Sequence, residues 1–246
     1  MIFLGYLRHQ KNKMKNLFFL SAILLLMISC SGNNTNMMIV NGNVKGLKKG
    51  TLYLQHIPDS TLTIIDSVQV DGDGTFNFET ELESPEIFYL YLKKEDANDI
   101  NDRITFFGEP GTITINTSWN TFDMNPKIEG SETQKKLKEY QKTMSRFNMK
   151  NLELMQIARN PEVPLDSLQL DSLQDLSDKN LKRGYAFALN FALNNKNSYI
   201  APFIALNDVS DANVIYLDSI YNSLSPEVAE SKYGNLLKEH LENVKK

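Results

Sequence analysis

The chain has 246 residues and a formal net charge of −4, and 41% of its residues are hydrophobic. This length is enough for one or two cores of ordinary size. An acidic chain without a basic stripe is a poor candidate for binding nucleic acid, because such binding depends mainly on neutralising phosphates. We therefore expect no nucleic-acid partner.

The N-terminal segment predicts export. Lys11, Lys13 and Lys15 precede an apolar run at 17–28, which closes on the small residue Ser29. A cationic region, an apolar region and a small residue in this order are typical of a secretion signal. The run is about a dozen residues long, well short of the roughly 20 that a membrane-spanning helix needs. We expect it to target the chain to the membrane and not to span it.

Cys30, the single cysteine of the chain, follows the apolar run directly. Met27-Ile28-Ser29-Cys30 resembles the bacterial lipobox, in which the thiol is acylated and the cysteine becomes the new N-terminus. Met27 departs from the leucine that is usual at the first lipobox position. The resemblance implies lipidation of Cys30 and anchoring through acyl chains. The alternatives are an ordinary signal peptide and a buried or reactive thiol.

Residues 38–118 have the pattern of short strands. Seven segments of 6 to 8 residues are rich in β-branched and aromatic types, with Gly, Pro, Asn and Asp between them: MIVNGNV, TLYLQH, TIIDSVQV, TFNFET, EIFYLYLK, RITFFG and TITINTS. This spacing favours an antiparallel sandwich or a partly open barrel. Alternation of apolar and polar residues predicts a solvated face for most strands. Glu86–Lys93 is apolar in both registers and should be covered on both faces.

The rest of the chain has helical periodicity. Ser131-Glu132-Thr133-Gln134 is a capping-box pattern, and it should begin a long amphipathic helix that ends before Pro161. A second helical region is expected from Leu165, with Gly184 as a weak point. Further helices are predicted after Ser198, from Asp211 to Asn222 and, beyond the N-cap Ser225, from about Lys232 to Val244.

These patterns predict an α+β fold in which the β part comes first. We expect an antiparallel β-sandwich-like domain of about seven strands at 38–130 and a helical domain of about four or five helices at 131–246. Residues 1–29 are predicted to be the signal peptide, with Met14 as the true start, and residues 30–37 the lipidated tether.

Several longer stretches resemble a known family. VNGNVKGLKKGTLYLQ, IDSVQVDGDGTFNFE, SPEIFYLYL and the Glu109-Pro110-Gly111 turn resemble the domain of unknown function at the N-terminus of many bacterial thioredoxin-like, thiol-disulfide oxidoreductase lipoproteins. NNKNSYIAPFIAL and LDSIYNSLSPEVAESKYGNLLKEHLE resemble the helical region that follows that domain. The resemblance covers residues 38–246 and implies the fold, a lipoprotein context and a cell-envelope location.

The sequence departs from that family in one respect that matters for function. The redox domain of such proteins carries a Cys-x-x-Cys pair, which this sequence does not contain. Thiol chemistry requires a thiolate, and the single candidate is expected to be acylated. We therefore expect no thiol–disulfide activity, and the resemblance supplies no catalytic residues.

Two patterns could suggest metal binding or catalysis. Asp71-Gly72-Asp73-Gly74-Thr75 could present oxygens to calcium, but Phe76 and Leu82 stand where an EF-hand needs Gly and Glu. We interpret this stretch as a hairpin turn. His56 and His240 belong to no hydrolase or zinc motif and are interpreted as surface residues. We expect no metal, no cofactor and no catalytic residue.

Three aromatic residues are candidates for ligand contact. Trp119 lies at the exit of the last predicted strand and could stack on a sugar or dock a partner, although burial between sheet and helices is the favoured explanation. Tyr89 and Tyr91 could form a binding stripe on one strand, but any covered sheet face would show the same alternation.

The leading hypothesis is a membrane-anchored envelope lipoprotein that acts as a non-catalytic binding or accessory module, attached through its N-terminal lipid and binding an envelope protein. The segment after Cys30, Ser31-Gly32-Asn33-Asn34, lacks the acidic residues that some lipoproteins use for surface export. We therefore expect the outer membrane, facing the periplasm. One alternative is the N-terminal half of an oxidoreductase whose thioredoxin-like domain is lost or separately encoded. Another is a glycan-capture lipoprotein.

Overall fold

The computed structural model describes residues 36–94, 102–162 and 164–245. The predicted signal peptide and Cys30 lie outside the described residues. Within the described part, no helix combines the length and apolar character needed to cross a bilayer.

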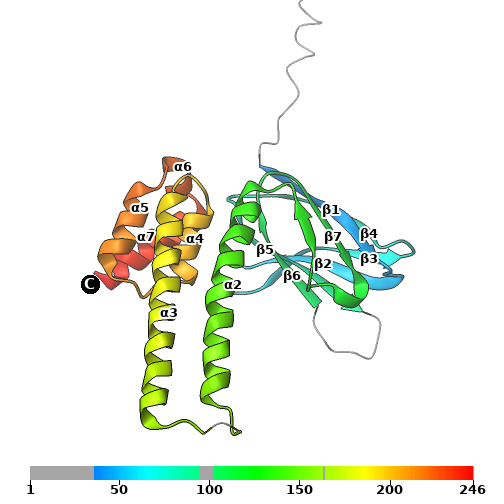
Figure 1. The fold of residues 1–246 in the computed structure, drawn as a ribbon. Helices are drawn as coiled ribbons and strands as arrows, with labels where there is room; N and C mark the ends of the chain where they lie inside the picture. Colours follow the sequence, from blue (N-terminus) through cyan, green and yellow to red (C-terminus); the bar gives the residue numbers. More distant parts are fainter. Residues whose placement is uncertain (1–35, 95–101, 163, 246) are drawn as a thin grey trace, which may run out of the picture. The chain divides into compact units, whose positions relative to one another are not determined.

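The described residues contain eight strands in two four-stranded sheets, followed by helices (Figure 1). The strand order is β4-β1-β7-β8 in one sheet and β3-β2-β5-β6 in the other. The seven predicted strands are present, and the predicted β-then-α order is confirmed. The strands are β1 (Met37–Lys45), β2 (Lys49–His56), β3 (Thr63–Asp71), β4 (Thr75–Glu81), β5 (Glu86–Lys94), β6 (Asp102–Gly108), β7 (Gly111–Ser118) and the short β8 (Lys127–Glu129).

One strand pairing differs from the predicted antiparallel arrangement. β1 and β7 run parallel, with Met38 opposite Gly111 and Lys45 opposite Ser118. Parallel neighbours need a long crossover connection. The intervening chain supplies it by passing twice through the other sheet. Alternation of apolar and polar residues does not encode this order, because it reports only which face of a strand is buried.

The turn at Asp71–Thr75 is not a hairpin turn, because β3 and β4 belong to different sheets. Gly74 has φ +78°, and a Cβ at this position would lie 2.2 Å from the Val44 carbonyl oxygen, so only glycine lets the turn close against β1. Asp73 Oδ1 accepts hydrogen bonds from the Thr75 backbone N–H at 3.0 Å and its hydroxyl at 2.7 Å. These bonds lower the Asp73 pKa.

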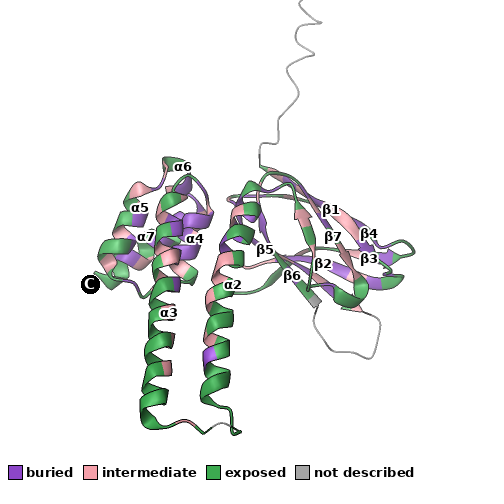
Figure 2. Ribbon diagram, viewed as in Figure 1, coloured by how far each residue is buried: buried purple, intermediate pink, exposed green. Residues whose placement is uncertain are grey.

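Apolar side chains from both sheets fill the space between them, as the alternation predicts. Phe78, Leu90, Phe106 and Ile113 are each at most 1% exposed and belong to one continuous core. Figure 2 shows buried residues in the strands interspersed with exposed and half-buried ones. The intersheet core therefore holds the β part together by burial of one face of each sheet.

The helices begin where capping residues occur in the sequence. They are α2 (Glu132–Ala158), α3 (Ser167–Asn194), α4 (Ile200–Asn207), α5 (Val214–Ser223), α6 (Pro226–Ala229) and α7 (Lys232–Val244), preceded by the 3-10 turn η1 (Trp119–Thr121). Ser131 caps α2 as predicted, since its Oγ accepts from Gln134 N at 2.9 Å. Asp166 and Gln169 form a capping box at the start of α3.

The predicted capping box at the start of α2 is only half formed. Gln134 Oε1 accepts the Phe107 backbone N–H at 2.7 Å, so this side chain joins the helix to β6. The Glu109 carboxylate takes its place, accepting from Glu132 N at 2.5 Å and from Thr133 Oγ1 at 2.7 Å. A carboxylate at a helix N-terminus is favoured by the free backbone donors and the helix dipole.

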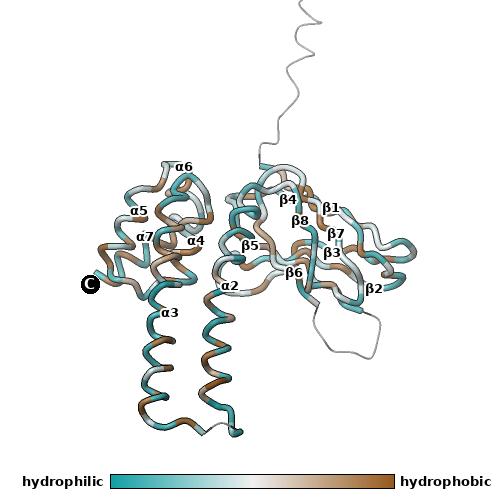
Figure 3. The backbone as a smooth tube through the Cα atoms, in the orientation of Figure 1, coloured by the Kyte–Doolittle hydropathy of each residue, from teal (hydrophilic) through white to brown (hydrophobic). Residues whose placement is uncertain are grey.

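A second core lies between the helices and the outer face of β5 and β6. Ile87 and Phe107 belong to it, together with helix residues such as Leu137, Ile204 and Leu237, all at most 7% exposed. β5 is thus covered on both faces at its first residues, as its sequence predicts. Figure 3 shows apolar segments alternating with polar ones along the helices.

Candidate binding surfaces

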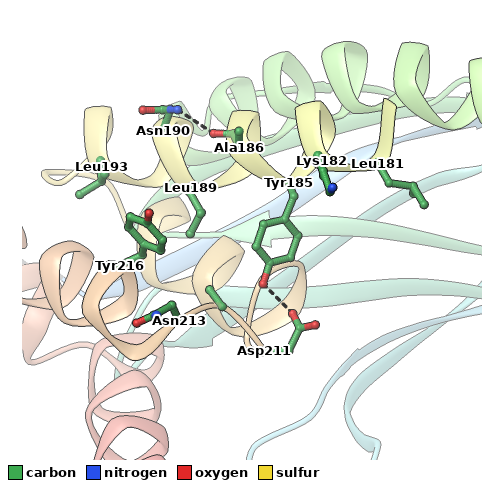
Figure 4. A pocket seen from close by; sticks show the side chains of 11 residues that line it. Leu181, Lys182, Tyr185, Ala186, Leu189, Asn190, Leu193, Asp211, Asn213 and Tyr216 are labelled. Atoms are coloured by element: carbon green, nitrogen blue, oxygen red, sulfur yellow. Dashed lines mark hydrogen bonds between the residues drawn. The ribbon is translucent and has the colours of Figure 1, made fainter. Parts of the chain in front are cut away.

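An apolar groove lies between α3 and α5 (Figure 4). Its volume of about 730 Å³ is within the range of small-ligand and peptide sites. Its lining consists of Leu181, Lys182, Tyr185, Ala186, Leu189, Asn190, Leu193, Asp211, Ala212, Asn213 and Tyr216.

The groove exists because α3 carries two apolar stripes. Residues such as Phe187 and Phe191 pack against Tyr140 of α2. Leu181, Tyr185, Leu189 and Leu193 recur every fourth residue and form a second stripe on the side of α5. Phe187 and Phe191 thus pack within the α2–α3 pair. Tyr185, Leu189 and Leu193 are half-buried against the helical core, and Leu181 is left exposed at one end of the stripe.

The floor of the groove is open to a ligand at both ends. Leu181 is 55% exposed and Tyr216 is 53% exposed. At the rim, Tyr185 Oη donates to Asp211 Oδ1 at 2.8 Å (Figure 4). Burial and the Asp211 carboxylate raise the Tyr185 pKa to about 12, so this hydroxyl stays protonated at neutral pH. The groove is therefore suited to hold an apolar surface against a rim of fixed polar groups.

A second cleft, of about 680 Å³, lies where β2 and β5 meet α7. Glu86 is only 9% exposed there. Its carboxylate is bound by Lys232 Nζ, which also donates to the Ile57 carbonyl. His56 Nδ1 lies 3.1 Å from the other carboxylate oxygen. The buried charge is thus paired, and the cluster links sheet to helix.

The interpretation of both histidines as surface residues is wrong. The His56 side chain is 23% exposed, and its ring stacks on Phe88 with 5.6 Å between centroids. His240 is partly buried, with Nε2 2.8 Å from the Ser210 carbonyl oxygen. Each ring is held by a partner far away in the sequence, which no local motif reveals.

The favoured interpretation of Trp119 as a buried residue is also wrong. Trp119 is 43% exposed. A Cβ on Gly46 would lie 2.7 Å from its Cδ1, so the ring packs on a glycine backbone, and Lys94 Nζ lies 5.6 Å from the ring centre. The indole is therefore held against the end of the β part, beside η1, with nearly half of its surface in solvent.

Tyr89 and Tyr91 form a different group from Trp119. Both half-buried rings share the Arg103 guanidinium, at 5.5 and 5.6 Å. Tyr91 also stacks on Tyr53 across the β2–β5 pair, with 5.8 Å between centroids. Neither tyrosine lines the α3–α5 groove. In the part of the chain that the structure describes, no group of three or more His, Cys, Asp or Glu side chains is placed to hold a metal ion.

Two features of these surfaces could have been found in the sequence. Glu86 is the one acidic residue within the apolar run EIFYLYL, and a carboxylate in a doubly covered strand requires a buried partner. The Leu181-Tyr185-Leu189-Leu193 spacing marks a second face of α3. Lys232 could not have been identified as the partner of Glu86, because the contact spans 146 residues of sequence.

Together these features define a two-sheet β module that continues into a helical module with an apolar groove between α3 and α5. Residues 38–137 match the family described as Domain of unknown function (DUF4369). The match begins in β1 and ends in the second turn of α2, so it includes Gln134, which fastens that helix to β6. Comparisons with curated proteins and with solved structures found no match.

Proposed function

We propose that the protein is a membrane-anchored envelope lipoprotein that acts as a non-catalytic binding or accessory module. The observation that carries the binding role is the α3–α5 groove, in which the lining side chains Leu181 and Tyr216 are each more than half exposed. The groove offers apolar area and a fixed polar rim, which are the properties of a recognition site. Its occupant is proposed to be an envelope protein.

The anchor is proposed from the sequence around Cys30. A cationic segment, a short apolar run and a small residue precede this cysteine. Acylation of the thiol would hold the folded part at the membrane, and the residues that follow Cys30 favour the outer membrane facing the periplasm. The proposed partners are therefore the membrane and an envelope protein, with no nucleic acid.

A crosslinking experiment tests the binding role. A photoreactive amino acid at Tyr216, in the groove, should give a discrete adduct in intact cells. The matched control is Asn222, which is exposed on the same helix α5 but does not line the groove. Equal adducts from both positions, or none from Tyr216, would count against the groove as the binding site.

Metabolic labelling with a clickable fatty acid tests the anchor. The wild-type chain should be labelled and should remain in the membrane fraction after an alkaline wash. The Cys30→Ser variant should take up no label, and its far-UV circular dichroism should match that of the wild-type chain. A labelled Cys30→Ser variant would refute acylation at this thiol.

A second candidate function is the front half of a thiol–disulfide oxidoreductase. Support comes from the DUF4369 match at 38–137, which coincides with the segment that resembles the N-terminal domain of thioredoxin-like lipoproteins. Translation of the DNA beyond the codon for Lys246 tests it. A thioredoxin-like pattern with Cys-x-x-Cys there would favour this function, and its absence in every frame would refute a redox domain lost to a premature stop.

Glycan capture is a third candidate, favoured by the exposure of Trp119. Because this is the only tryptophan of the chain, intrinsic fluorescence reports on this one ring. Titration with a broad glycan panel should quench or shift the emission if a sugar stacks on it. An unchanged spectrum across the panel would refute this function.

A further inference from the structure

One face of α2 carries a row of cations. Lys135, Lys138, Lys142, Arg146 and Lys150 follow one another at spacings of three and four residues, and all five are exposed. They lie opposite the face that packs on α3 through Tyr140 and Phe147. We call this row the basic face of α2. The expectation of a chain without a basic stripe is wrong here, because the row becomes continuous only on a helix.

Three cations of the basic face have no counter-ion in the described structure. Lys135 pairs with Glu132 at 2.5 Å, and Lys150 pairs with Glu153 at 3.0 Å. Lys138, Lys142 and Arg146, between them, form no salt bridge within residues 36–94, 102–162 and 164–245. Glu139 is the acidic residue that interrupts the row. The middle of the face therefore presents a net positive charge to an outside partner.

The start of β1 lies beside the start of α2. Met38 is opposite Gly111 in the β1–β7 pair. Two residues before Gly111, the Glu109 carboxylate caps the first turn of α2 through Glu132 and Thr133. The start of β1, which follows the proposed tether in sequence, therefore lies near the helix end from which the basic face begins.

We propose that the basic face of α2 docks on the anionic phospholipid headgroups of the membrane that holds the lipid anchor. The proposal rests on the proposed acylation of Cys30. The chain from 30 to 36 can reach ~24 Å when extended, and the basic face from Lys135 to Lys150 is ~23 Å long. The tether is thus long enough for the whole face to lie on the bilayer.

Two physical effects favour this docking. Anionic leaflets attract Lys and Arg side chains within a Debye length of about 8–10 Å. Tethering also makes the contact intramolecular, so a weak surface attraction is enough to orient the protein. Since α5 lies on the other side of α3 from α2 (Figure 1), docking would turn the α3–α5 groove away from the bilayer and toward a partner.

Fluorescence quenching on vesicles tests the proposal with the acylated full-length protein. Met149, which is 61% exposed on the basic face, is replaced by cysteine. Because the Cys30 thiol is acylated in this protein, a thiol-reactive fluorophore labels the new cysteine alone. The vesicles are pure phosphatidylcholine or contain about 30 mol% phosphatidylglycerol, with a quencher on the lipid headgroup. The matched label is Ile215→Cys on α5, where the side chain is 67% exposed.

Docking predicts at least twofold stronger quenching of the Met149 label on anionic vesicles than on neutral ones, with little change for the Ile215 label. The difference should vanish in about 1 M salt, where the Debye length is ~3 Å. The triple variant Lys138→Gln/Lys142→Gln/Arg146→Gln should show no difference in quenching between anionic and neutral vesicles. The control Lys179→Gln/Arg183→Gln/Lys238→Gln removes three exposed cations elsewhere on the helices and should leave it intact.

The two ways of failing are distinguishable. Protein that does not sediment with either kind of vesicle lacks the anchor, and then the proposed function and this inference fail together. Protein that sediments normally while the Met149 label is quenched equally on neutral and anionic vesicles is anchored but does not dock. Circular dichroism of each variant confirms that loss of quenching is not loss of fold.

Discussion

At the scale of single residues, loss of the buried ion pair between Glu86 and Lys232 should lower the free energy of unfolding. Lys232→Met leaves a carboxylate that is 9% exposed with His56 as its remaining ion partner. We expect a loss of about 2 kcal/mol in the free energy of unfolding, below the value for a completely buried pair because both side chains retain some solvent contact. Urea unfolding measures it.

The companion variants separate charge from packing. Glu86→Gln/Lys232→Met should recover part of the loss, because no uncompensated charge is then buried. Lys245→Met breaks the exposed Asp218–Lys245 pair, in which the side chains are 31% and 49% exposed, and should cost less than about 0.5 kcal/mol. Equal losses for Lys232→Met and Lys245→Met would contradict the assignment of Glu86 as a buried, paired charge.

Two partly buried tyrosines make the fold sensitive to alkali. Burial is the main cause that raises the pKa of Tyr185 and of Tyr233 to about 12 each. The unfolded chain releases these protons near pH 10, before the folded protein does. Stability from these groups is therefore complete below about pH 10 and is lost as the pH rises toward about 12.

Urea unfolding at several pH values checks this expectation. The free energy of unfolding should fall steadily between about pH 10 and 12. Tyr233→Phe should make the fall less steep, while Tyr53→Phe, which alters a half-buried tyrosine stacked on Tyr91, serves as the comparison. Identical pH dependence for wild type and Tyr233→Phe would contradict the role of burial.

At the scale of elements, two helical glycines should respond to alanine in opposite directions. A Cβ on Gly184 of α3 would lie 3.4 Å from Phe147 Cγ, an ordinary contact, so Gly184→Ala should stabilise α3 by up to about 1 kcal/mol. A Cβ on Gly234 of α7 would lie 2.3 Å from the Val228 carbonyl oxygen. Gly234→Ala should destabilise the protein by about 2 kcal/mol or more.

Thermal unfolding of the two variants measures both effects. A lower midpoint for Gly184→Ala would mean that α2 and α3 approach more closely at Phe147 than the structure shows. An unchanged midpoint for Gly234→Ala would mean that the first turn of α7 can move away from Val228.

The elements that the sequence predicts correctly are those specified by local chemistry. Ser131 caps α2, and the alternation in β4, β6 and β7 places Phe78, Phe106 and Ile113 in the core. The features that it misses depend on residues distant in sequence. Glu109 replaces Gln134 in the α2 cap because Gln134 has a partner on β6. The local sequence around Gln134 does not show that its side chain binds the Phe107 N–H instead of the helix N-terminus.

At the scale of the whole molecule, the surfaces also depend on contacts between residues distant in sequence, which sequence patterns do not show. The Trp119 ring packs on Gly46, which is far from it in sequence, and the side chain remains 43% exposed. The local sequence around Trp119 does not show this contact. The groove depends on where α5 packs against α3, and the parallel β1–β7 pair depends on the path between the sheets. Composition and periodicity state which faces are apolar but not which of them remain unpaired.

The last prediction concerns whether the β and helical parts unfold together. Ile87 and Phe107 belong to sheet strands, yet they lie in the core that the helices form. Phe107 packs edge-on against Phe203 at 5.8 Å, and its N–H is bound by Gln134. Because removing a helix would expose this strand face, we expect one cooperative transition for residues 36–246.

Leu217→Ala provides the test, because this side chain is 0% exposed in α5 and belongs only to the helical core. It should cost about 2–5 kcal/mol. Far-UV circular dichroism follows the helices, and fluorescence of the single tryptophan, Trp119, follows the β part. If the parts share one transition, both signals shift to the same lower urea midpoint. If the helical signal alone shifts, the two parts are separate domains that meet near residue 130, and contact through Phe107 and Gln134 is too weak to couple them.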